Sequence, residues 1–166
     1  MIMSNEALAL AMAGLVPVLL YIMYSDAKSM RIPNICVLLI LAIFIPAGLY
    51  GLPLETFLWR LGHVVIAYGI AYGVYVLAGA ANVGGGDLKL IIAIVPYVPG
   101  AYFGLLLVIW AAMTLVMVGM FFALRKLLRG KDYGFVSLGQ KKHFPAGVSI
   151  SGAILTLMGM QLAGSI

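Results

Sequence analysis

One stretch of the chain, residues 90–124, runs for 35 positions without a charged side chain. A transmembrane helix needs about 20 apolar residues to cross a bilayer core about 30 Å thick, so this stretch is too long for one crossing and short for two. Its residues 96–100 read Pro-Tyr-Val-Pro-Gly. Proline removes a helix donor and disfavours helix in the residue before it. We therefore expect a short helix over about 88–96 and a full one over about 101–124.

Four further apolar runs fill most of the remaining chain, at residues 7–24, 32–54, 61–86 and 144–166. A loop with Glu55 and Arg60 precedes the third of these runs. The chain is 64% hydrophobic and 9% charged, whereas soluble domains are roughly half apolar and a quarter charged. We expect an all-α fold: a polytopic integral membrane bundle of six transmembrane helices with a short fourth helix, in one membrane-embedded domain over residues 1–166.

Basic residues indicate how this bundle is oriented. With six crossings and the N-terminus outside, nine of the ten Lys and Arg residues lie inside, and only Arg60 lies outside. The positive-inside rule favours this arrangement, which predicts a multi-pass protein of the plasma (inner) membrane. The net charge of +5 then reflects topology, and we expect membrane lipid and no nucleic acid as a partner. The inside residues are Lys28, Arg31, Lys89, Arg125, Lys126, Arg129, Lys131, Lys141 and Lys142.

The third apolar run carries tyrosines at helical spacing. These are Tyr68, Tyr72 and Tyr75, and Gly69 and Gly73 lie among them as a small-xxx-small pair. Such a pattern is typical of a packing face with a close helix contact.

Two of the five acidic residues lie at predicted membrane boundaries. Asp26 lies in a polar turn after the first run, and Asp87 follows three glycines at residues 84–86. Six crossings bring both to the cytoplasmic boundary, where an ionisable residue is a functional hypothesis. Alone, Asp26 could be a solvated loop residue and Asp87 a helix N-cap. Three successive glycines exceed what a cap needs; they permit positive φ and leave room for a peptide backbone.

A pair of carboxylates on one side of a membrane suggests an aspartic protease. One carboxylate takes a proton from water while the other protonates the scissile carbonyl, and no cofactor is needed. A glycine loop could hold an extended substrate by strand pairing. We expect no metal, because Cys36 is the single cysteine and the two histidines lack partners at ligand spacing.

Two sequence signatures carry a family resemblance. Residues 26–34 read DAKSMRIPN and resemble the D-x5-IPN signature of the type IV prepilin peptidases. Residues 84–90 read GGGDLKL and resemble their GxGD-x-KL signature. The tail at 143–150 reads HFPAGVSI, similar to the Pro-x-Gly-Val stretch that opens the last span in the short tight-adherence (Flp pilus) branch.

The resemblance implies a six-helix membrane aspartic endopeptidase that removes the basic leader of prepilins at the cytoplasmic face. Its partner would be a prepilin or pseudopilin with a basic leader and a hydrophobic N-terminal helix. Longer members carry a cysteine-bearing insert between the first two spans and also methylate the pilin. Only residues 27–34 separate Asp26 from the second span, so we expect the peptidase without the methyltransferase.

The same resemblance assigns individual positions. Asp26 and Asp87 correspond to the catalytic pair. Gly84 and Gly86 match the two glycines of the loop, and Gly85 occupies its variable position. Supporting positions in the two signatures are Pro33, Asn34 and Lys89, where Pro33 suits the first turn of a helix and Asn34 could cap it.

Other functions stay open at this point. An ion- or proton-coupled carrier subunit could use the same two aspartates to bind a cation, and would move charge without cleaving anything. A non-catalytic assembly scaffold would tolerate Asp→Asn at both positions. The presenilin and signal-peptide-peptidase type also uses GxGD, but this chain lacks its Tyr-Asp pair, its Pro-Ala-Leu motif and its extra spans.

Overall fold

The computed structural model describes residues 2–78, 84–127, 135–136 and 144–166. In these ranges the regular structure is entirely helical. Two short 3₁₀ turns, η1 (Val95–Tyr97) and η2 (Gly100–Tyr102), separate the fourth helix from the fifth. The α-helices are α1 (Asn5–Ser29), α2 (Asn34–Gly51), α3 (Leu54–Ala78), α4 (Gly85–Ile94), α5 (Phe103–Leu127) and α7 (Ala146–Leu162).

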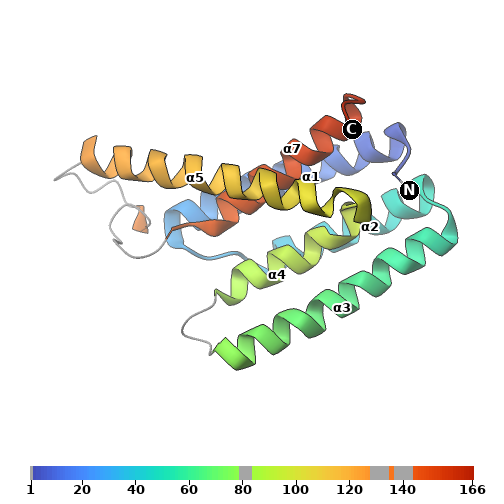
Figure 1. Ribbon diagram of the computed structural model, residues 1–166, viewed down its shortest axis with the longest axis horizontal. Helices are drawn as coiled ribbons and strands as arrows, with labels where there is room; N and C mark the ends of the chain where they lie inside the picture. Colours follow the sequence, from blue (N-terminus) through green and yellow to red (C-terminus); the bar gives the residue numbers. More distant parts are fainter. Residues whose placement is uncertain (1, 79–83, 128–134, 137–143) are drawn as a thin grey trace.

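Successive helices run in opposite directions, so that the chain goes back and forth along one axis (Figure 1). Helix α1 packs against both α2 and α7, and α5 packs on α7. The short α4 contacts α2, α3 and α7, whereas α3 lies at the edge of the bundle beside α4 and η1. Both described ends of the chain lie at the same end of the bundle (Figure 1).

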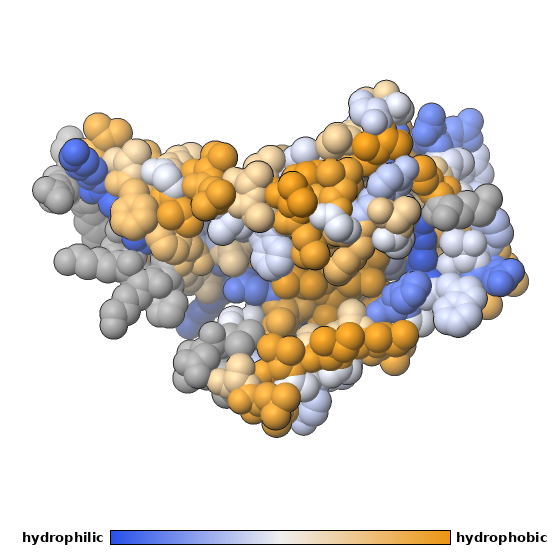
Figure 2. Space-filling view, in the orientation of Figure 1, coloured by the Kyte–Doolittle hydropathy of each residue, from blue (hydrophilic) through white to orange (hydrophobic). Residues whose placement is uncertain are grey.

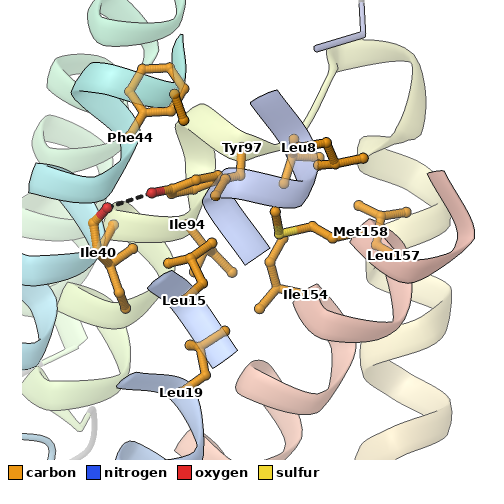
Figure 3. Close-up of a cluster of buried hydrophobic side chains, with 14 of the residues drawn as sticks. Leu8, Leu15, Leu19, Ile40, Phe44, Ile94, Tyr97, Ile154, Leu157 and Met158 are labelled. Carbon is orange, nitrogen blue, oxygen red and sulfur yellow. Dashed lines mark hydrogen bonds between the residues drawn. The ribbon is translucent and has the colours of Figure 1, made fainter. Parts of the chain in front are cut away.

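The core is apolar and joins the first helix to the last (Figure 3). Its one hydroxyl in this view belongs to Tyr97 in η1, which donates a hydrogen bond of 2.6 Å to the backbone oxygen of Ile40 in α2. A buried tyrosine hydroxyl needs such a partner, and this one ties the end of the short helix to α2. The other labelled core residues are Leu8, Leu15, Leu19, Phe44, Ile94, Ile154, Leu157 and Met158.

Helix lengths divide the bundle into long and short members. By length and composition α1, α2, α3 and the segment Gly100–Leu127 can each cross a membrane. Helix α7 is 17 residues long and α4 only 10, and 10 residues rise about 15 Å, half of a bilayer core.

Hydrophobic side chains cover most of the visible face, and hydrophilic ones gather toward its two ends (Figure 2). The chain is an all-α membrane helix bundle, and the predicted break at residues 96–100 and the short fourth helix are confirmed.

Several predicted boundaries are wrong. Helix α1 continues through Asp26 to Ser29, and α4 begins at Gly85. Helix α3 begins at Leu54, so Glu55 and Arg60 are helical and not in a loop. Arg60 is 5% exposed, and its Nη1 donates a hydrogen bond of 2.9 Å to the backbone oxygen of Pro96.

This hydrogen bond gives the buried guanidinium group of Arg60 a backbone partner within the bundle. A helix that ends inside the bundle leaves backbone oxygens without intrahelical partners, and at membrane depth the protein must supply the donors. Arg60 supplies one of them to η1.

The predicted close contact at the small residues of α3 is not made among the described residues. A Cβ added to Gly69 or Gly73 would meet no described atom within 4 Å. The tyrosine face also lies at the surface, with Tyr68 62%, Tyr72 60% and Tyr75 37% exposed.

Candidate active site

A polar cleft of about 630 Å³ opens where α1 ends and where α2, α4 and α7 begin. All three sequence motifs contribute to it, because the alternating helices return these segments to one end of the bundle (Figure 1). Its lining consists of Asp26, Met30, Arg31, Ile32, Asn34, Gly84, Gly85, Gly86, Asp87, Lys89, Phe144 and Ala146.

Asp26 lies in the last turn of α1 and is 4% exposed. Its Oδ2 accepts a hydrogen bond of 2.8 Å from the backbone N–H of Gly147, near the start of α7. The helix stops at Met30, which adopts the left-handed conformation (φ 55°) and donates its N–H to the backbone oxygen of Asp26 at 2.8 Å. A left-handed residue is a common way to end a helix, and here it turns the chain into α2.

Gly147 fits this contact only because it has no side chain. A Cβ at this position would lie 2.8 Å from Oδ2 of Asp26 and 2.9 Å from Cδ1 of Ile32. Gly147 belongs to the tail motif, but the sequence alone does not assign it to the site. The available signal was a glycine two residues after Pro145, at the first turn of the last helix.

Asp87 is the third residue of α4 and is half-buried. The helix N-cap is Gly84, so the alternative in which Asp87 caps the helix is wrong. The carboxylate folds back over Gly84, where an added Cβ would lie 2.5 Å from Oδ2. An alanine at residue 84 would therefore force the Asp87 carboxylate to move.

The other two glycines are less constrained. A Cβ on Gly86 would lie 3.4 Å from Cβ of Ile32, and one on Gly85 would lie 3.8 Å from the ring of Tyr75. None of the three glycines uses the positive φ that glycine permits, since Gly164 is the one described glycine with that conformation. At Gly85, the variable position of the motif, a side-chain methyl group would therefore make only an ordinary van der Waals contact.

A hydrogen bond joins the second halves of the two signatures. Nζ of Lys89 donates to Oδ1 of Asn34 at 3.1 Å, linking the starts of α4 and α2. Asn34 is the first residue of α2, and the N-cap is Pro33, which makes no side-chain capping bond. The suggested capping role of Asn34 is therefore replaced by a contact with Lys89.

The two carboxylates lie near enough for their charges to interact. Asp87 lies in the first turn of α4, whereas Asp26 lies in the last turn of α1 and against the first turn of α7. Helix N-termini carry partial positive charge and free N–H groups, which orient and stabilise nearby carboxylates. The fold thus holds two acidic groups together in one water-accessible cleft. Among the described residues, no three or more His, Cys, Asp or Glu side chains are grouped as metal ligands would be.

Fold and cleft together define a membrane helix bundle with a pair of interacting carboxylates at one end. The sequence model of the type IV leader peptidase family matches residues 13–129. That match covers more than half of the chain and includes Asp26 and Asp87, so the chain belongs to the type IV leader peptidase family. No curated protein and no solved structure matches the chain.

Proposed function

We propose that this protein is an aspartic endopeptidase that removes the N-terminal leader from type IV prepilins of the Flp-like kind. Asp26 and Asp87 are the catalytic pair in this proposal. The observation that carries it is that both carboxylates line one polar cleft within a chain of the leader peptidase family.

Hydrolysis by this pair needs one water molecule and one shared proton. One carboxylate takes a proton from the attacking water while the other gives its proton to the carbonyl oxygen of the scissile bond. Collapse of the tetrahedral intermediate breaks the C–N bond and transfers a proton to the leaving amine. Oδ2 of Asp26 accepts the Gly147 hydrogen bond, which holds this carboxylate in the cleft.

Gly84 positions the substrate backbone, whereas Gly85 and Gly86, expected in a loop, belong to helix α4. Gly84 is exposed and has an extended conformation, with φ −66° and ψ 105°. Extended, side-chain-free backbone can pair with a substrate strand, as in other cases of recognition by strand addition. The peptide around the scissile bond then lies beside Asp87, which follows three residues later.

The cleft faces the cytoplasm in this proposal, and the N-terminus lies outside. Basic residues at the cleft end of the bundle support this orientation: Lys28, Arg31 and Lys89 lie there, and α5 carries Arg125 and Lys126 in its last turn. Four residues, 30–33, connect α1 to α2. This connection has no room for a second catalytic insert, so the activity is leader cleavage without methylation.

The decisive experiment co-expresses the protein with a prepilin that carries a basic leader, and follows leader removal by gel shift. Asp26→Asn and Asp87→Asn each lower the cleavage rate by about 100-fold or more, as expected for a lost general acid or base. Glu55→Gln, in the first turn of α3 at the opposite end, retains activity. Near-normal cleavage in either Asp variant, or an ion or proton flux without cleavage in proteoliposomes, contradicts the proposal.

A further inference from the structure

A second groove, of about 280 Å³, lies between α3 and α4. One wall is formed by Tyr68, Tyr72 and Tyr75 of α3, and the other by Leu88 and Ile92 of α4. The walls are largely apolar, and the three tyrosine rings are partly or mostly exposed. In an apolar groove, tyrosine offers a large ring for packing and a hydroxyl for a hydrogen bond.

This groove is continuous with the polar cleft. Gly85 and Lys89 line both, and the ring of Tyr75 lies beside Gly85. From Tyr75 to Tyr68 the wall extends over seven residues, or about 10 Å along the helix. The groove therefore starts at the glycine segment and leads away from the polar end, along the apolar length of the bundle.

We propose that this groove binds the apolar helix that follows the scissile bond of the prepilin, an inference that rests on the proposed function. Residues just beyond a bond held at Asp87 can move only about 3.5 Å per position from the cleft. An apolar segment that begins there needs an adjoining apolar surface. The α3–α4 groove is such a surface, and Gly85 and Lys89 connect it to the cleft.

Continuity with the cleft also selects this occupant over others. A lipid chain or a helix of a second copy would need an apolar face, but neither would need that face to lead into a pair of carboxylates. A substrate helix needs both. The proposal therefore assigns Tyr68, Tyr72 and Tyr75 as contacts of the substrate after its cleavage point.

Disulfide crosslinking in membranes tests the assignment. The protein carries Cys36→Ser to remove its own thiol, Asp87→Asn to keep the substrate intact, and either Tyr72→Cys or Ile70→Cys. The substrate is a prepilin-like chain with a basic leader, a scissile glycine and an apolar segment of about 20 residues, with one cysteine early in that segment. Tyr72 and Ile70 are 60% and 64% exposed, but two residues along a helix place them on nearly opposite faces.

The expected result is at least about tenfold more crosslinked product with Tyr72→Cys than with Ile70→Cys, because only residue 72 faces the groove. Equal crosslinking, or preference for residue 70, overturns the assignment. Cleavage of the same substrate is measured in parallel with Asp87 intact. If cleavage occurs without crosslinking at residue 72, the groove assignment is wrong and the proposed function stands. If no cleavage occurs, the proposed function itself fails.

A kinetic test uses Ala71, which also lines the groove. Ala71→Trp fills the groove and should slow cleavage of the prepilin with its apolar helix, while cleavage of a peptide that ends shortly after the scissile bond is unchanged. Ile70→Trp is the matched control and leaves both rates unchanged. Equal slowing of both substrates by Ala71→Trp, or no slowing of either as expected for a groove that holds only lipid, contradicts the proposal.

Discussion

The backbone N–H of Gly147 donates a 2.8 Å hydrogen bond to Oδ2 of Asp26, a residue 121 positions earlier in the chain. This bond attaches the start of the last helix to the end of the first and fixes one carboxylate oxygen of the cleft. It makes the tail motif part of the candidate site, in addition to the two aspartate motifs.

Gly147→Ala should therefore reduce leader cleavage without preventing folding. The new methyl group would displace the Asp26 carboxylate, since it would lie 2.8 Å from Oδ2, and a shift of about 1 Å at a reacting group can cost about 100-fold. We expect kcat to fall with little change in KM. Gly159→Ala on the same helix is the control, because a Cβ there meets no described atom within 4 Å. A variant Gly147→Ala as active as Gly159→Ala would show that this contact does not position Asp26.

Alanine substitutions at Gly84 and Gly85 should affect the cleavage rate unequally. Gly84→Ala places a methyl group 2.5 Å from the Asp87 carboxylate, whereas Gly85→Ala meets only ordinary contact with Tyr75. Cleavage should fall by about 100-fold in Gly84→Ala, on the same scale of misplacement, and stay near the parent rate in Gly85→Ala. The measurement is the initial cleavage rate at equal amounts of membrane-inserted protein. Similar rates in the two variants would refute this account of the motif.

The hydrogen bond between Lys89 and Asn34 predicts energetic coupling. Asn34→Leu and Lys89→Met each remove it, at an expected cost of roughly twofold to tenfold in cleavage, corresponding to about 0.5–1.5 kcal/mol. Because either change breaks the same bond, the double variant should lose little more than a single one. A double-mutant cycle on kcat/KM measures this. Simple multiplication of the two losses would mean that the residues act independently.

Orientation in the membrane can be tested with cysteine labelling. In a Cys36→Ser background, cysteines at Ser29 and Ser137 should react with an impermeant reagent from the cytoplasmic side, and one at Thr56 from the outside. Ser29 ends α1 at the cleft end and Thr56 lies in the first turn of α3 at the other. Ser137 lies outside the described residues. Labelling of Ser137 from the outside would contradict the six-crossing topology.

Much of the architecture follows from local properties of the sequence. The lengths of the uncharged runs predict a membrane helix bundle, because a span must match the thickness of the membrane. The proline cluster at residues 96–100 predicts the short fourth helix, because proline interrupts the backbone hydrogen bonds of a helix. Because successive spans cross the membrane in opposite directions, six crossings also predict that Asp26 and Asp87 return to one end of the bundle. Both residues do line one cleft.

The remaining features depend on contacts between distant segments. Arg60 resembles a loop residue by charge alone, whereas in α3 it is buried and its Nη1 donates to the Pro96 oxygen. Gly147 resembles an ordinary glycine at a helix start until Asp26 lies against it. Partners of this kind cannot be deduced from hydropathy or spacing in a single sequence.

Helix α3 has only two buried residues, Phe57 and Arg60, and both lie in its first two turns. Its attachment to the bundle is therefore concentrated at the end far from the cleft. A mutational scan along this helix should show a gradient. Substitutions near residue 60 should lower the amount of folded protein, whereas those from residue 68 onward should leave abundance intact. Any loss of activity in that second half then reports on function, free of the folding defects that usually obscure such scans.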